Sequence, residues 1–424
     1  MREKAKVWLN WLQGYTQADM RYLARGGFWS SVNFFTGSLL SVFLVLAFAN
    51  FLDKETYGIY KYILSLTGSL SFLTLTGMNT AVIQAVAGGD ENAFLRSIRI
   101  QKKWNMLYVL GAVFLSTYYF INDNHLFAYG ILIVGLTFPL TVTFNTYGAY
   151  LAGKKDFKRS SIYATISNTI YIVVMVITLF LTQNILILIT VYALANFLPN
   201  IYLHYKIVRD FKPARSDSGN QGLFKYSAQL SFVNIFGTLS QYVDKIVVFH
   251  YLGAVQLAVY NFALLIPERV RGYSKNVGSI LLPKLAAKTV AEIAPVFYKR
   301  FWQGAFIGAV ISSAYILTAP YLYKLFLPQY LESVIYSQVM SLTLIFTVPA
   351  TYVGSIFYAQ KMIKTIYLSS AVGHLSKIGL FIVLGALWGI WGVIFSFVLT
   401  YSLGTLYNFY LWHLEVKKFK SLKV

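Results

Sequence analysis

The chain contains no cysteine, which excludes disulfide bonds, thiol chemistry and cysteine-bound metals. Acidic residues are also scarce, with 15 Asp and Glu against 36 Lys and Arg, and charged residues make up only 12% of the 424. A soluble domain carries about twice that charged fraction. The histidines are too dispersed to predict a zinc site, so we expect no metal and no cofactor; they are His125, His204, His250, His374 and His413.

Long apolar segments make up most of the chain. Apolar residues form 57% of the chain, and about twelve segments are long enough to span a membrane. Crossing the hydrocarbon core takes about 20 residues of helix. The predicted fold class is therefore an all-α polytopic membrane protein of about 12 transmembrane helices, over 26–50, 58–87, 103–121, 126–151, 158–181, 184–206, 223–250, 257–282, 296–319, 331–359, 363–386 and 388–412.

Lys and Arg lie in every second gap between these segments. With the amino terminus assigned to the cytoplasm, 28 of the 36 fall in cytoplasmic segments and two, Lys54 and Lys324, in external ones. This bias predicts a multi-pass protein of the cell (inner) membrane with both termini cytoplasmic. The net charge of +21 is spread over short segments, which favours contact with anionic headgroups of the lipid bilayer over a nucleic-acid partner.

The two halves of the sequence repeat with an offset of 200 residues. Phe51-Leu52 then matches Tyr251-Leu252, and Ile59-Tyr60 matches Val259-Tyr260; chance matching of apolar residues is the alternative. Each half has an even number of spans, so the repeat is parallel and predicts two six-helix bundles, related by a pseudo-two-fold axis, around a central cavity. The predicted domains are a cytoplasmic interfacial helix over 1–25, an N-terminal lobe over 26–208, a cytoplasmic linker over 209–222, a C-terminal lobe over 223–412 and a basic cytoplasmic tail over 413–424.

Charged residues inside the predicted spans are the main candidates for function, because charge at that depth is costly. Two are acids, Asp244 and Glu268, and Arg25 lies at the mouth of the first span. The spacing of Glu268, Arg271 and Lys275 places them on one face of a helix. Six bases fall within spans: Lys61, Lys245, Arg269, Arg271, Lys275 and Lys377.

The excess of bases over acids favours an anionic ligand. Arg binds phosphate oxygens through a planar fork, whereas Lys acts as a compact point charge. Asp244 and Glu268 are assigned to ion coupling or to electrostatic tuning. Two interpretations without a ligand remain: Glu268–Arg271 and Asp244–Lys245 are buried ion pairs, or Lys275 only reaches the cytoplasmic edge. No catalytic residue is predicted, and substrate binding is assigned to Arg269, Arg271, Lys61, Lys245, Lys377, Lys275 and Arg25.

Two motifs resemble those of a known family. They are Phe51-Leu52-Asp53-Lys54-Glu55-Thr56-Tyr57-Gly58-Ile59-Tyr60, and Asp244-Lys245-Ile246-Val247-Val248 followed by Tyr251-Leu252-Gly253. The chain, over nearly its whole length, resembles the polysaccharide flippases, the O-antigen and exopolysaccharide exporters of the multidrug/oligosaccharidyl-lipid/polysaccharide superfamily. The resemblance implies a transporter and not an enzyme. Its partner would be an undecaprenyl-diphosphate-linked oligosaccharide, flipped to the outer leaflet by alternating access with proton or sodium coupling, for O-antigen, capsule or exopolysaccharide biosynthesis.

Other functions need features that differ from those in this sequence. A multidrug or cation antiporter of the same superfamily needs acids facing its cavity, and here bases predominate. The related lipid II flippases have a cavity rich in Arg but typically fourteen spans. A membrane-bound glycan polymerase or ligase usually needs a sizeable external loop, and a non-transporting scaffold would enclose no hydrated cavity.

Overall fold

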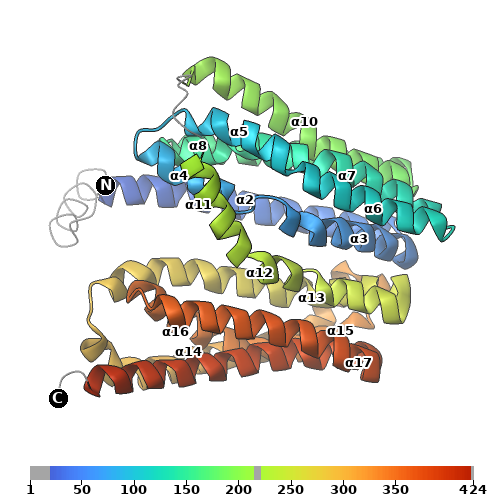
Figure 1. Cartoon of the computed structure of the whole chain (residues 1–424). Coiled ribbons are helices and arrows are strands. Elements are labelled where there is room, and N and C mark those ends of the chain that lie inside the picture. Colours follow the sequence, from blue (N-terminus) through green and yellow to red (C-terminus); the bar gives the residue numbers. More distant parts are fainter. Residues whose placement is uncertain (1–19, 214–220, 422–424) are drawn as a thin grey trace, which may run out of the picture. The chain divides into compact units, whose positions relative to one another are not determined.

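The computed structural model describes residues 20–213 and 221–421, which fold into helices without a β-strand (Figure 1). Most of the interfacial helix predicted over 1–25 and part of the linker predicted over 209–222 lie outside the described residues, and the remaining residues 20–25 form the start of α2. The elements are α2 (Met20–Phe51), α3 (Lys54–Ser69), η1 (Leu70–Leu73), α4 (Met78–Ala87), α5 (Ala93–Trp104), α6 (Met106–Ile121), α7 (His125–Asn145), α8 (Tyr147–Gly153), α9 (Phe157–Leu181), α10 (Ile185–Phe211), α11 (Gln221–Val233), α12 (Ile235–Ser240), α13 (Val243–Ala286), α14 (Val290–Phe326), η2 (Pro328–Tyr330), α15 (Ser333–Ser341), α16 (Thr343–Ala359) and α17 (Ile363–Ser421).

The helices are built to lie in lipid. Among the described residues, eight helices are long and apolar enough to cross a membrane. The count is nine if Lys54–Leu73 and Met78–Ala87, which are bent by 52° at a short break, are taken as one broken span. Large apolar side chains cover their outer sides; Phe114, Leu181 and Leu317, for example, are all largely exposed. Such surfaces would associate in water. The protein is therefore a multi-pass membrane protein.

Two of the long helices are helical hairpins. The hydroxyl of Tyr260 lies 2.9 Å from Oδ2 of Asp244 in α13, and Oγ of Ser396 lies 2.8 Å from the carbonyl oxygen of Leu380 in α17. A straight helix would separate residues sixteen apart by about 24 Å. The chain therefore turns back within each. The two legs of α17 each span the membrane, whereas in α13 the short leg before Gly253 completes a span together with α12 and the longer leg forms the next span. Counted with α2 and the bent α3–α4 passage, these hairpins confirm the predicted class of about twelve transmembrane helices.

Glycine makes both turns possible. Gly253 has φ 83° and ψ −176° inside α13, and Gly389 has φ 58° inside α17. Side chains with a Cβ rarely adopt these angles. Gly253 also follows Asp53 by 200 residues, and Asp53 lies where α2 ends and α3 begins. The sequence repeat and the two helix breaks therefore coincide.

Contacts divide the chain into two units. Unit 1 comprises Met1–Leu52 and Leu70–Ile235, and unit 2 comprises Asp53–Ser69 and Phe236–Val424. The lobes predicted over 26–208 and 223–412 stay a prediction. By contacts, α3 is part of unit 2, while the rest of the same bent span, η1 and α4, is part of unit 1.

Helix α3 packs tightly against α13 within unit 2. A Cβ at Gly58 would lie 1.9 Å from the carbonyl oxygen of Ala254, so only glycine allows this approach. Four residues further along α3, the rings of Tyr62 and Phe249 stack with their centroids 3.7 Å apart. This packing brings Lys61 of α3 into the same unit as the charged residues of α13.

Candidate functional site

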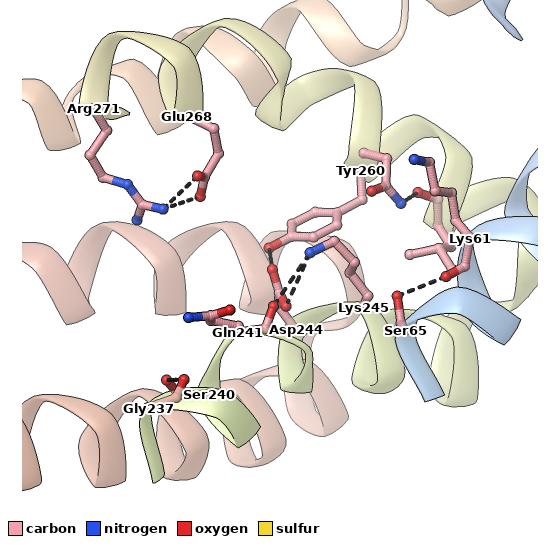
Figure 2. A network of polar contacts seen from close by, with 12 residues as sticks. Lys61, Ser65, Gly237, Ser240, Gln241, Asp244, Lys245, Tyr260, Glu268 and Arg271 are labelled. Carbon is pink, nitrogen blue, oxygen red and sulfur yellow. Dashed lines mark hydrogen bonds and ion pairs between the residues drawn. The ribbon is translucent and has the colours of Figure 1, made fainter. Parts of the chain in front are cut away.

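Asp244 is the buried acid of unit 2, with only 3% of its surface exposed. Tyr260 donates a hydrogen bond of 2.9 Å to Oδ2 of Asp244, and Nζ of Lys245 lies 3.9 Å from Oδ1 (Figure 2). Among the described residues, Oδ1 has no hydrogen-bond partner. A buried carboxylate with so few hydrogen bonds depends on nearby positive charge.

Two further lysines supply positive charge from other helices. Lys377 of α17 interacts electrostatically with Asp244, and also with Arg271 and Lys245 of α13. Lys61 of α3 interacts with Lys245, and its Nζ lies 5.3 Å from the centre of the Tyr57 ring. The fold thus gathers bases from three helices that are distant in the sequence.

Arg271 and Glu268 form an ion pair one helical turn apart on α13. Nη2 of Arg271 lies 2.5 Å from both carboxylate oxygens of Glu268 (Figure 2). The guanidinium carbon also lies 4.7 Å from the centre of the Tyr401 ring, a cation–π contact. Because it pairs with an acid on one side and a ring on the other, Arg271 is held in one orientation and is 17% exposed.

A cavity of about 390 Å³ lies beside Arg271, within the size range of small-molecule sites. We call it the cationic cavity, and α12, α13, α16 and α17 form its walls. Its polar lining includes Ser240, Arg271, Ser369, His374, Lys377 and Asn408. Ser369 donates to Oδ1 of Asn408, which leaves the amide NH₂ of Asn408 as a donor. Hydroxyl, amide and cationic donors therefore surround one polar space.

His374 is oriented by a hydrogen bond on α12. Its Nδ1 lies 2.8 Å from Oγ of Ser240, and Oγ also lies 2.9 Å from the carbonyl oxygen of Gly237. The hydroxyl has one proton, and a carbonyl can only accept it. Ser240 therefore donates to Gly237, and Nδ1 of His374 donates to Ser240.

The structure brings some of the predicted site residues together and leaves others apart. Arg271 and Lys377 line the cationic cavity. Among the described residues, Arg269 has no ion-pair partner, and it does not line this cavity. The side chains of Arg25 and Lys275 lie outside the described part of the chain. Both ion pairs that the sequence suggests, Asp244–Lys245 and Glu268–Arg271, are present.

Uncharged partners of these residues are harder to recognise from sequence. Tyr260 is the hydrogen-bond donor to Asp244. The sequence signal that points to Tyr260 is its match with Tyr60 in the 200-residue repeat. Ser240 and Asn408 carry no such signal, because isolated polar residues are common in membrane helices. Only the packing of α12 and α17 shows that they line the same cavity as Arg271.

Comparison with known proteins identifies the family of the chain. Residues 23–266, more than half of the chain, match the family described as "Polysaccharide biosynthesis protein". The chain belongs to this family. The match includes Lys61, Asp244 and Tyr260 of the charged cluster and ends before Arg271. A search of curated protein sequences returns no match.

Solved structures extend the likeness to the whole fold. Lipid II flippase MurJ, in an inward closed conformation, is 15% identical over 90% of this chain and 86% of that chain, with a TM-score of 0.70. An inward-facing multidrug resistance transporter of the MATE family in the MOP superfamily is 14% identical over 95% of this chain and 96% of that chain, with a TM-score of 0.66. At these identities the likeness shows the fold alone. The chain therefore shares the fold of these two solved structures.

Proposed function

We propose that the protein moves an undecaprenyl-diphosphate-linked oligosaccharide from the cytoplasmic to the outer leaflet by alternating access. The observation that carries the proposal is the cationic cavity, where Arg271 and Lys377 lie between membrane helices. Membership of a polysaccharide biosynthesis family supports a glycan as cargo. The fold supports transport rather than catalysis.

A diphosphate matches the chemistry of this site better than a neutral or cationic group does. Arg271, Lys377 and the donors around them offer positive charge and N–H or O–H groups to phosphate oxygens. A cation would meet like charge in the same space. Lys61, Lys245 and Arg269 extend the positive charge along α3 and α13, and Arg25 and Lys275 complete the predicted binding set.

Asp244 is the group we assign to ion coupling, and Glu268 tunes Arg271 through their ion pair. A proton or a sodium ion at Asp244 would compete with Lys245, which lies 3.9 Å away. Lys245 would then be released to the phosphate path. Ion binding at Asp244 would thereby couple the ion gradient to the positive charge that Lys245 offers to the substrate's phosphates.

The proposal is tested with Arg271→Gln and Lys377→Gln in a strain that lacks the native gene. Outward movement of the lipid-linked glycan should fall about tenfold or more for each, because a charge-assisted contact is lost. The stalled lipid-linked intermediate should accumulate and be identified by mass spectrometry. Lys364→Gln is the matched control, since Lys364 lies on the same helix, is exposed and does not line the cavity. Unchanged transport by both variants at normal protein levels would contradict the proposal.

A cation antiporter is the second candidate, and the observation in its favour is the buried Asp244, whose Oδ1 has no hydrogen-bond partner among the described residues. Such a carboxylate is suited to exchanging a proton for a cationic substrate. Efflux of ethidium from cells that express the protein separates the two functions. Ethidium efflux that Asp244→Asn abolishes, with no glycan movement, would select the antiporter.

A further inference from the structure

A second cavity in unit 2 lies between α13 and α14, with α16 at its base. Its volume is about 700 Å³, in the upper part of the range for small-molecule sites. Its walls are mainly apolar and include Leu281 of α13, Val296, Ile307 and Ile311 of α14, and Tyr352 of α16. Val296 and Ile307 are about half exposed, so the cavity is an open groove.

Three basic residues lie toward one end of this groove. Lys284 is in the last turn of α13, Lys288 is in the connection to α14, and Arg300 follows on α14. All three are exposed, and none has an ion-pair partner among the residues that the structure describes. Ile311 lies eleven residues beyond Arg300, about 16 Å along the helix. The groove therefore has a cationic end and a long apolar end.

The groove adjoins the cationic cavity. Thr351 of α16 lines both spaces, although the groove lies on the α14 side of α13 and the cavity on the α17 side. The charge bias of the sequence assigns the α13–α14 connection to the cytoplasm. The cationic end of the groove would then lie at the headgroup level of the cytoplasmic leaflet, where a lipid-linked substrate is first met.

We propose that this groove holds the part of the substrate's isoprenoid chain nearest to the phosphates, with the phosphates against Lys284, Lys288 and Arg300. The inference rests on the proposed function. A lipid phosphate and its chain need a cationic site next to an apolar channel, and this charge complementarity is what the groove offers. Its volume holds only a section of a long chain, so the remainder would stay in the bilayer. Because Thr351 lines both spaces, the phosphates would be held beside the cavity that contains Arg271.

The test uses the full chain in phosphatidylethanolamine nanodiscs and a polyprenyl diphosphate that carries a diazirine near the phosphates. Photolabelling should map to α13 and α14 along the groove. Ile307→Trp fills the apolar section, and the triple variant Lys284→Gln, Lys288→Gln, Arg300→Gln removes the charges. Each should weaken saturable labelling about tenfold or more.

Two control variants lie next to the altered residues on α14. Phe306→Trp adds bulk at a position that is exposed but does not line the groove, and Lys299→Gln removes a charge beside Arg300 that likewise lies outside it. Both should label as the unaltered protein does. The groove would be overturned as the polyprenyl site by any of three results. The control variants could lose as much labelling as the groove variants, the label could map only to other helices, or phosphatidylglycerol could compete with the probe as well as unlabelled polyprenyl diphosphate does.

A glycan transport assay separates this inference from the proposed function. If Ile307→Trp lost labelling but transported the glycan normally, the groove proposal would fail and the function would stand. If labelling followed the expected pattern while the unaltered protein moved no glycan, the function would fail and the groove would stand as a polyprenyl diphosphate site.

Discussion

Asp244 carries the negative charge of its cluster, yet it accepts only one side-chain hydrogen bond among the described residues. Lys245 and Lys377 act on it directly. The carboxylate therefore offsets repulsion between cations that would otherwise oppose the packing of α17 on α13. A change of one residue at this point should affect stability as well as transport.

We predict that Asp244→Asn destabilises the protein by about 1–3 kcal/mol, because it leaves the half-buried Lys245 and Lys377 without their acid. Tyr260→Phe removes only a hydrogen bond to a charged group and should cost about 1.5–3 kcal/mol. Thermal unfolding in nanodiscs measures both. An Asp244→Asn variant that unfolds at the temperature of the unaltered protein would contradict this view of the cluster.

At the scale of elements, the turn of α13 depends on Gly253. Its backbone angles, φ 83° and ψ −176°, lie in a region that is essentially confined to glycine. Gly253→Ala should therefore destabilise the hairpin by about 1–3 kcal/mol. Gly354→Ala is the control: Gly354 is inside α16 with open space around it, and alanine there should stabilise by about 0.5–1 kcal/mol. Equal unfolding temperatures for the two variants would be inconsistent with strain at Gly253.

The connection between α4 and α5 provides a pH-dependent contact in unit 1. Glu91 pairs with Lys154, and Tyr150 donates a 3.1 Å hydrogen bond to Oε2 of Glu91. The hydrogen bond from Lys154 lowers the pKa of Glu91 from its ordinary value of 4.5. A carboxyl group whose pKa is lower in the folded state contributes stability above its unfolded pKa and loses it as the pH falls through the folded pKa.

The unaltered protein should therefore lose more stability than Glu91→Gln as the pH falls below about 5. The two proteins are compared by unfolding temperature across that pH range. Above the unfolded pKa the unaltered protein should be the more stable of the two. Parallel pH profiles would show that the Glu91–Lys154 pair contributes nothing to stability.

At the scale of the whole molecule, the absence of cysteine allows the topology to be tested directly. Gln329 and Ala287 are exposed residues that flank opposite ends of α14. The charge bias predicts that Gln329→Cys reacts with a membrane-impermeant maleimide in intact cells, and that Ala287→Cys reacts only after the membrane is opened. The reverse labelling pattern would invert the predicted orientation.

The fold class was predictable because its signals are local. The length and hydropathy of each segment are sums over neighbouring residues, and they indicated about twelve spans that the helices confirm. The repeat also predicted equivalent positions for Asp53 and Gly253, and both mark helix breaks. The bend that divides α3 from α4 was less evident, because the segment 58–87 has the length and overall hydropathy of one continuous span.

The candidate site was predictable only in its charged members. Asp244, Lys245 and Arg271 stand out in an apolar sequence, since charge in a membrane helix is costly. Ser240 and Asn408 do not, and their role as lining residues depends on which faces of α12 and α17 meet.

The sequence by itself determined that this protein is a helical membrane protein with a strong charge asymmetry and a set of bases in its spans. Hydropathy and charge act residue by residue, so they are readable without coordinates. Only the tertiary structure decided that Asp244 meets Tyr260, that Lys377 reaches both Asp244 and Arg271, and that a groove with a cationic end adjoins their cavity. Those relations depend on where glycines turn the helices and on how the helices then pack, which involves residues distant in the chain.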